Sequence, residues 1–412
     1  MLLGVLVLPA AVFCFRPLAP LETHFYVWQR AWTPELREAL RRGATRASGF
    51  SVYAGDFECG NEGAGFAPVS VAWNALADAR IPVTLVFRAR ECLNTEDPKT
   101  VSRLSGAMAE TARQARAAGV RVAGLQLDYD CPTSKLGSYA RLLSGMREPL
   151  KNETLSITAL PTWLPDVQFR NLARQTGYYV LQVHSFETPK SVQDAVQVCP
   201  AGRVPAYLKR AAAFGVPFYL ALPTYGYQVV FNAQGAFAGI RAEAAGRPLP
   251  PGAQAREVLA NPKEIAGLVR QLSAKHPRAL RGLIWFRLPV PSDQHNWTWD
   301  TLAQVLDGAA PEARFTAEVR APENDLCEVW IKSPGGAYAA GSIQITLDVD
   351  AAHCLASDLL NHFEEVSRAG SSLVLRGPAP PAGKDLLALW MRFVHNTVDK
   401  SSVKIKSVEV IE

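Results

Sequence analysis

Short apolar runs alternate with longer stretches of helical hydrophobic spacing along most of the chain. The runs predict β-strands at 24–30, 49–58, 82–90, 122–130, 154–164, 177–187, 217–227 and 281–289. The other stretches predict helices at 33–42, 68–80, 99–118, 134–148, 165–174, 203–214, 257–275 and 298–307. This alternation is typical of a (β/α)8 TIM barrel, an α/β fold. A doubly wound sheet is the alternative, but no glycine-rich phosphate turn follows an early strand.

The pattern changes at about residue 311, where short alternating runs such as CEVWIKS and GSIQITLDVD replace helical spacing. Alternation with a period of two predicts an antiparallel β-sandwich. The predicted organisation is therefore a leader at 1–20, a barrel at 21–310 and a β-sandwich at 311–412. The sandwich is expected either to bind carbohydrate or to cover one face of the barrel.

The first fifteen residues, MLLGVLVLPAAVFCF, are apolar and carry no charge. They are too short for a comfortable transmembrane helix and resemble the hydrophobic part of an export signal. A short membrane anchor and a first buried element are the alternatives. We therefore expect a periplasmic or secreted protein, or one that this segment holds at a membrane.

Composition narrows the classes of partner. The 412 residues are 48% hydrophobic and 20% charged, which is enough apolar material for two folded domains. The formal charge of +5 is spread along the chain without a basic block, which argues against nucleic acid as a partner. The expected state is a monomer. No cofactor motif and no metal-ligand spacing are present, so neither a cofactor nor a metal is expected.

Six cysteines remain after Cys14, and none of them forms a C-x-x-C pair. Disulfides are expected in an exported protein. The favoured pairs are Cys59–Cys92, Cys131–Cys199 and Cys327–Cys354. Buried reduced thiols are the alternative.

The segment VAGLQLDYDCP at 122–132 carries the most distinctive chemistry. Side chains two apart on a strand share a face, so Gln126, Asp128 and Asp130 point the same way. The Cβ atoms of the two aspartates are expected roughly 6 to 7 Å apart. Close like charges raise one carboxyl pKa and leave that group able to donate a proton. The alternative is that the aspartates cap a helix or hold a loop arginine.

Polar and aromatic residues collect where the predicted strands end, and these ends converge on one site in a TIM barrel. Aromatic rings can stack on the C–H faces of sugars, and arginines can bind an anionic sugar or pair with the acids. Trp28 and Tyr53 are either such a wall or simple packing. The predicted substrate-binding residues are Asp56, Glu58, Arg88, Gln126, Trp163, Gln182, His184, Glu187, Tyr225, Tyr227, Trp285 and Arg287.

GLQLDYDCP resembles the fourth strand of the chitinase-like glycoside hydrolases of family 18, which reads roughly D-G-x-D-x-D-x-E and often continues with Tyr-Pro. Gly124, Asp128 and Pro132 match this motif, Asp130 falls at its acid Glu, and Gln126 falls at an inner Asp. LALPTYGY at 220–227 and GLIWFRLPVPSD at 282–293 are similar to its seventh and eighth strands, with Trp285 in the place of the Trp that floors the sugar site. The strand-six Tyr-Asp pair has no counterpart in LQVHSFE. The whole layout looks most similar to a bacterial family known only as a domain of unknown function.

The resemblance implies a general acid at Asp130 assisted by Asp128, and a polysaccharide or oligosaccharide as the partner. In family 18 the acid is a Glu and the nucleophile is the substrate's own acetamide. The shorter Asp withdraws the proton donor by roughly 1.5 Å, and a misplacement near 1 Å can cost ~100-fold in rate. A rebuilt site is expected to recruit Asp56, Glu58 or Glu187 as base or nucleophile.

Three hypotheses follow from these residues. The first is an exported glycoside hydrolase that acts on a bacterial polysaccharide. The second is a barrel that binds carbohydrate without cleaving it, because the acid is an Asp and the strand-six pair is absent. The third is a cell-envelope scaffold whose barrel mouth is closed and whose sandwich binds another protein.

Overall fold

The structure is a computed structural model. It describes residues 18–60, 63–90, 95–184, 188–194, 196–241, 249–293, 295–312, 314–333, 342–380, 383–394 and 402–411. Residues 1–17 of the predicted leader, Glu187 and Cys92 lie outside these ranges.

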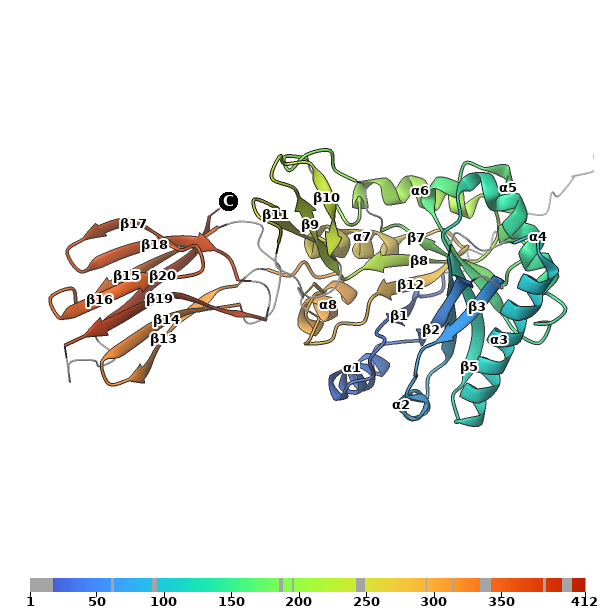
Figure 1. Ribbon diagram of the computed structural model, residues 1–412, viewed down its shortest axis with the longest axis horizontal. Helices are drawn as coiled ribbons and strands as arrows, with labels where there is room; N and C mark the ends of the chain where they lie inside the picture. The colour runs from blue at the N-terminus through green and yellow to red at the C-terminus, as the bar shows by residue number, and fades with distance from the viewer. Residues whose placement is uncertain are drawn as a thin grey trace, which may run out of the picture.

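A closed parallel barrel forms the larger part of the molecule (Figure 1). Its strands run in the order β1-β12-β8-β7-β6-β5-β4-β2, and β1 also pairs with β2 and so closes the ring. The predicted TIM barrel is therefore confirmed. The strand bounds are β1 Glu22–Val27, β2 Gly49–Gly60, β4 Val83–Ala89, β5 Val122–Tyr129, β6 Leu155–Ala159, β7 Tyr178–Gln182, β8 Phe218–Pro223 and β12 Leu280–Phe286.

Helices surround the barrel at the predicted places. Several begin at a side chain that accepts a hydrogen bond from a free amide of the first turn: Thr33 before α1, Asp97 before α3 and Asn261 before α7. Each of these helices also has a proline in its first turn, where no amide donor is lost. The bounds are α1 Pro34–Ala44, α2 Trp73–Ala79, α3 Pro98–Ala117, α4 Leu136–Met146, α5 Val167–Ala173, α6 Val204–Ala212, α7 Pro262–Ala274 and α8 Trp299–Leu306.

Two additions to the barrel were not predicted. β3, Gly63–Pro68, runs antiparallel to the extended end of β2. β9 (Gly226–Phe231), β10 (Phe237–Arg241) and β11 (Gln254–Leu259) form a separate antiparallel sheet between β8 and α7. The predicted helix at 257–275 consequently begins only at Pro262, because residues 254–259 pair with β9.

The C-terminal region is the predicted β-sandwich of two four-stranded antiparallel sheets (Figure 1). Buried and half-buried residues alternate along β15, so one side of this strand faces the core of the sandwich. β16 and β17 were not predicted, because most of their side chains are exposed and their sequences do not alternate between apolar and polar residues. One sheet holds β13 Thr316–Glu323, β14 Leu326–Lys332, β19 Asp385–Phe393 and β16 Cys354–Leu359; the other holds β17 Glu364–Ala369, β18 Ser372–Pro378, β15 Ser342–Val349 and β20 Val403–Ile411.

Side chains on the two faces of the barrel strands have different environments. A large apolar core lies between the strands and the helices. A smaller cluster fills the barrel itself and includes Tyr26, Val86, Val180, Ala221 and Ile284. This inner cluster fills the barrel interior with side chains rather than leaving an open channel.

The favoured disulfide pattern is wrong. Cys131 and Cys199 are buried free thiols, and Cys354 is a free thiol that therefore does not pair with Cys327. Burial raises the pKa of both Cys131 and Cys199 to about 12, so these thiols stay protonated at neutral pH. The third expected pair includes Cys92 and is outside the described residues. In the ranges that the structure describes, no helix is both long and apolar enough to span a membrane.

Glycine at position 282 is required by a close contact between β12 and β1. A Cβ atom there would lie 2.3 Å from the carbonyl oxygen of Glu22. Gly282→Ala is therefore expected to lower the free energy of unfolding by about 1–3 kcal/mol. Gly106→Ala is the matched control, because nothing lies within 4 Å of its Cβ position in helix α3, and it is expected to raise stability by about 1 kcal/mol. Urea unfolding of both variants tests the prediction, and equal midpoints would contradict it.

Candidate active site

A cavity of about 180 Å³ opens at the carboxyl ends of the barrel strands. This is the end at which TIM barrels carry their sites. Asp128 at the end of β5 and Asp130 just after it both reach this cavity, together with side chains from several neighbouring strands. The lining residues are Tyr26, Trp28, Arg88, Asp128, Asp130, Thr158, Gln182, His184, Tyr225 and Phe286.

The period of two along β5 places its polar side chains inside the barrel, as predicted. Gln126 lies deepest and is fully buried. Its amide nitrogen donates hydrogen bonds to the Tyr26 hydroxyl at 2.5 Å and to the Thr158 hydroxyl at 2.9 Å. Gln126 therefore forms a layer beneath the cavity and connects β5 to β1 and β6, while Asp128 and Asp130 stand above it.

The two aspartates have different surroundings. Asp128 is half-buried and Asp130 is exposed. Burial, followed by the charge of Asp130, raises the pKa of Asp128 to about 7, although a hydrogen bond from Thr158 and the charge of Arg88 oppose the shift. Arg88 is the register partner of Asp128 on β4. The pair can therefore hold one proton near neutral pH.

The imidazole ring of His184 forms another part of the cavity wall, and it is neutral. Its Nδ1 lies 3.3 Å from the Tyr225 hydroxyl, and its Nε2 is buried with no hydrogen-bond partner. Burial lowers the pKa of His184 to about 3. Gln182 donates a hydrogen bond to the carbonyl oxygen of His184 at 3.4 Å. The Nε2 atom of His184 is thus available to a ligand hydroxyl.

Aromatic rings complete the cavity, with Phe286 at their centre. Its ring centroid lies 5.2 Å from that of His184, 5.3 Å from that of Trp28 and 5.4 Å from that of Tyr225. Trp28 packs on Tyr53 at 4.8 Å, so Trp28 both lines the cavity and packs against the barrel. This aromatic set gives an apolar wall to the cavity that also contains the two carboxyl groups.

Backbone hydrogen bonds hold Tyr225 between two segments. The amide of Gly226 donates to the carbonyl of His295 at 2.7 Å, and the amide of Ala260 donates to the carbonyl of Tyr225 at 3.1 Å. The amide of Trp297 donates to the carbonyl of Thr224 at 2.8 Å. The end of β8 is therefore fastened to the β12–α8 connection and to the segment after β11.

The structure places two predicted tryptophans outside the cavity. Trp285 is fully buried on the helix side of β12, with its ring centroid 6.4 Å from that of Trp297, and Phe286 faces the cavity instead. Trp163 is fully buried, donates a hydrogen bond to the carbonyl of Cys131 at 3.2 Å and packs on Tyr139 and Phe169. Both expectations are corrected, because each ring belongs to the outer core.

Other predicted residues also lie away from the cavity. Asp56 is buried and accepts a hydrogen bond from Arg30 at 2.9 Å, and Glu58 pairs with Arg90 at 3.6 Å. The Arg287 guanidinium is paired with Asp293 at 2.6 Å, and Tyr227 is buried on β9. Arg88, Gln182, His184 and Tyr225 do line the cavity, as expected.

Three lining residues were not considered from the sequence, namely Tyr26, Thr158 and Phe286, and Trp28 had been left open between a sugar wall and simple packing. The position of each residue along its strand is the feature of the sequence that could have identified them. Tyr26 and Trp28 are two apart on or just after β1, and Thr158 and Phe286 occupy inward positions on β6 and β12. The prediction favoured polar residues beyond the strand ends over these inward positions.

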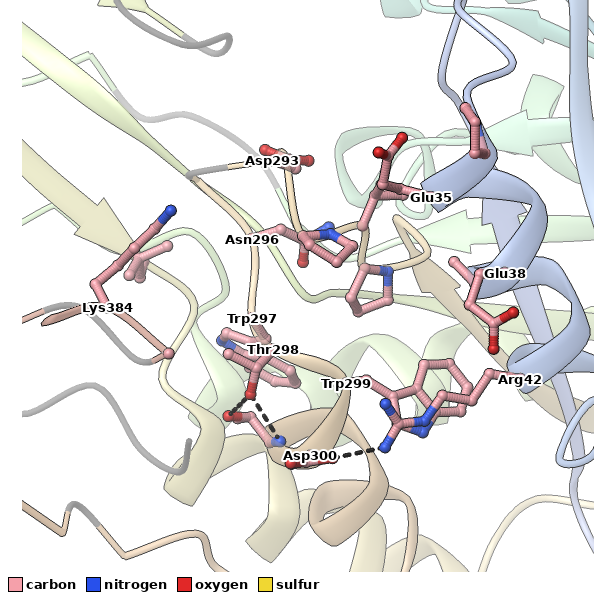
Figure 2. A pocket seen from close by; sticks show the side chains of 18 residues that line it. Glu35, Glu38, Arg42, Asp293, Asn296, Trp297, Thr298, Trp299, Asp300 and Lys384 are labelled. Carbon is pink, nitrogen blue, oxygen red and sulfur yellow. Dashed lines mark hydrogen bonds and ion pairs between the residues drawn. The ribbon is translucent and has the colours of Figure 1, made fainter. Parts of the chain in front are cut away.

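A second cavity of about 550 Å³ lies beside helix α1 (Figure 2). It is bounded by α1, the β12–α8 connection, and Gly383 and Lys384 of the sandwich. Figure 2 shows Arg42 reaching from α1 to Asp300, an ion pair of 2.7 Å. Neither Asp128 nor Asp130 lines this cavity, so the carboxyl chemistry belongs to the smaller one.

Asp128 is expected to make stability depend on pH. Because its folded pKa of about 7 is above the ordinary aspartate value of 3.8, the folded state binds more protons than the unfolded state between these values. The parent protein should therefore lose roughly 2 to 4 kcal/mol relative to Asp128→Asn as pH rises from 4 to 8. Denaturant unfolding of both proteins across this range tests this, with Asp78→Asn on the exposed surface of α2 as the control. A pH-independent difference between the parent and Asp128→Asn would contradict the raised pKa.

Comparisons with known proteins agree with the barrel. The spore cortex-lytic enzyme SleL of Bacillus megaterium is similar over 74% of this chain and 76% of its own, at 12% identity and a TM-score of 0.52. SleL of Bacillus cereus is similar over 70% of this chain and 75% of its own, at 14% identity and a TM-score of 0.50. These identities establish a shared fold only.

The sequence comparisons define the family. No curated protein matches the chain. The model of the family described as "Domain of unknown function (DUF3142)" matches residues 79–291, just over half of the chain and most of the barrel. The chain therefore belongs to the DUF3142 family.

Proposed function

We propose that the protein is a glycoside hydrolase that cleaves a bacterial polysaccharide at the barrel mouth. The observation that carries the proposal is the pairing of Asp128 and Asp130 in a cavity with an aromatic wall. A site that breaks a glycosidic bond needs a carboxyl group that is protonated near neutral pH and an apolar surface that orients a sugar ring. Both features are present within one small space.

Asp130 is the proposed general acid. Its exposed position lets the carboxyl group reach a glycosidic oxygen from the solvent side. Asp128 is the proposed partner, because its pKa of about 7 allows it to hold a proton that the pair shares. Gln126 supports this pair from below as a positioning residue through its bonds to Tyr26 and Thr158.

The nucleophile in this proposal is the substrate's own acetamide. Of the described residues that line the cavity, only Asp128 and Asp130 are carboxylates, while Asp56 and Glu58 are ion-paired elsewhere. The acetamide oxygen bonds to the anomeric carbon as the bond to the leaving oxygen breaks, and that oxygen takes the proton of Asp130. Water then attacks the same carbon, loses a proton to Asp130 and releases the acetamide, so the anomeric configuration is retained.

The cavity's size and walls indicate the part of the substrate that it holds. Its volume of about 180 Å³ is below the ~300 Å³ at which pockets for drug-sized ligands begin, so one sugar ring is the expected occupant. His184, Gln182 and Arg88 offer polar contacts to ring substituents. The structural likeness to a spore cortex-lytic enzyme and the resemblance to family 18 favour a cell-wall or chitin-like polymer of N-acetylated sugars.

Carbohydrate binding without cleavage is the second candidate. It is favoured by the acid itself, because an Asp at the position of the family 18 Glu holds its carboxyl group roughly 1.5 Å further from the scissile bond. A glycoside hydrolase turns over its polysaccharide, whereas a carbohydrate-binding barrel only binds it. The third hypothesis, a cell-envelope scaffold, expected a closed barrel mouth. The mouth contains a cavity, so this expectation is not met.

A turnover assay tests the proposal. The protein is incubated with chitin oligosaccharides, bacterial peptidoglycan and a neutral glucan that lacks acetamido groups. Release of new reducing ends is expected from the first two only, with retained configuration by NMR. Binding of the acetamido polymers without release would favour the second candidate, and neither binding nor release would refute both.

A further inference from the structure

Positive charge gathers at the end of the barrel opposite the candidate active site. The connections from each helix to the next barrel strand all lie at this end. Most contain an exposed cation: Arg46 after α1, Arg80 after α2, Arg121 after α3, Arg147 and Lys151 after α4, Arg174 after α5, and Lys275 and Arg278 after α7. The connection after α6 has none, but the last turn of α6 carries Arg210. We define these residues and Arg281 as the basic face.

Acidic residues neutralise little of the basic face. Within the same connections, carboxylates occur only after α4, where Glu148 pairs with Lys151 and Glu153 pairs with Arg116. Arg46 is paired with Asp307. Arg174, Arg210, Arg278 and Arg281 form no ion pair with a carboxylate of the described chain, although Arg281 is near enough to Glu22 for its charge to lower the pKa of that carboxyl group. An excess of exposed positive charge therefore remains on one side of a protein whose net charge is only +5.

The N-terminal segment enters the molecule at this same face. Leu18, Ala19 and Pro20 line a hollow of about 630 Å³ together with Glu22, His276, Arg278 and Arg281. Glu22 is the one carboxylate in this lining, and it already accepts a hydrogen bond from the Tyr219 hydroxyl at 2.6 Å. Leu18 is 39% exposed. The sequence before it is the uncharged apolar run of residues 1–15. The cations thus surround the point from which an apolar segment continues.

We propose that the basic face docks on a bilayer that contains anionic phospholipid, with lipid phosphates bound around Arg278 and Arg281 in the hollow. Clusters of cations beside an apolar segment are attracted to anionic lipid surfaces, at roughly 1 kcal/mol per cation. One short apolar segment alone binds a membrane weakly, and a cluster of cations beside it strengthens that binding. The barrel mouth then faces away from the bilayer. The sandwich does so too, because its residues Gly383 and Lys384 lie beside the β12–α8 connection at the mouth end, and Figure 1 shows it beyond α8 and the β9–β11 sheet.

Vesicle binding tests this orientation with two charge-matched variants of the full chain. The basic-face variant replaces Arg174, Arg210, Arg278 and Arg281 by Gln. The control replaces Lys99, Lys135, Lys190 and Lys263 by Gln, which are exposed and lie near the mouth end of the barrel. Flotation is measured with vesicles of phosphatidylcholine alone and with added phosphatidylglycerol, and circular dichroism checks that both variants are folded.

The parent and the control are expected to bind the phosphatidylglycerol vesicles much more tightly than the neutral ones, and salt should weaken this gain. The basic-face variant should lose roughly 1,000-fold in affinity for the anionic vesicles, because it lacks four cations, and keep its binding to neutral ones. Equal losses in the two variants, or no gain from phosphatidylglycerol, would overturn the proposal. Equally tight binding to a soluble polyanion such as heparin would also overturn it, because the face would then not be specific for a bilayer.

Discussion

Asp130→Asn is expected to lower kcat/KM for polysaccharide cleavage by about 10²–10⁴-fold, because the amide cannot donate a proton to the leaving oxygen. The variant removes no apolar side chain from the core, since Asp130 is exposed. Binding of a non-cleaved oligosaccharide should therefore change little, and the loss should appear in kcat rather than in KM. Reducing-end release under single-turnover conditions measures the effect directly.

Two further variants make this experiment decisive. Asp130→Glu restores the side chain that family 18 enzymes have, and it is expected to retain or increase turnover because the longer chain brings the proton donor closer. Asp358→Asn makes the same substitution on the exposed surface of the sandwich and should leave turnover unchanged. Full activity of Asp130→Asn would remove Asp130 from the acid role, whatever the substrate.

Trp285→Ala is expected to destabilise the protein by about 3–5 kcal/mol, because the substitution empties a large, fully buried site in the outer core. Phe286→Ala should cost less stability, since Phe286 is only partly buried and borders the cavity. It should instead raise the KM for the oligosaccharide, because the ring meets the sugar face. Thermal unfolding and steady-state kinetics of both variants separate the two roles.

The two variants would behave differently if Trp285, rather than Phe286, contacted the sugar. If Trp285 formed the sugar floor, as the resemblance to family 18 implied, Trp285→Ala would raise KM at nearly unchanged stability. Trp285→Phe offers a gentler test where the Ala variant does not fold, because it keeps an apolar ring in the same core. A normal KM with reduced stability is expected for Trp285→Phe.

The sequence predicted the barrel well because its periodicity is explicit. Strands and helices alternate with clear caps, and Gln126, Asp128 and Asp130 are polar residues with a period of two in an apolar run. That pattern alone indicates which side chains face the barrel interior. The aspartate pair was found for this reason.

Strand β12 shows where such reasoning stops. Its residues 282–286, GLIWF, are apolar on both faces, since one side meets the helices and the other the barrel interior. A continuous apolar run contains no alternation, so the side that faces the cavity could not be read, and Trp285 was chosen over Phe286. Trp163 was misplaced for another reason, because a 3-10 turn at Pro161–Trp163 ends the strand and directs the ring into the helix layer.

The fastening of β8 to its two neighbouring segments has a consequence for recognition. Tyr225 sits between amide–carbonyl bonds at Thr224 and Gly226, so this part of the wall is held rigid before any sugar arrives. A rigid wall loses little conformational entropy when the sugar binds. More of the free energy of the contacts therefore contributes to affinity. Selectivity for a given sugar would consequently depend on complementarity of shape rather than on closure of a flap at this side.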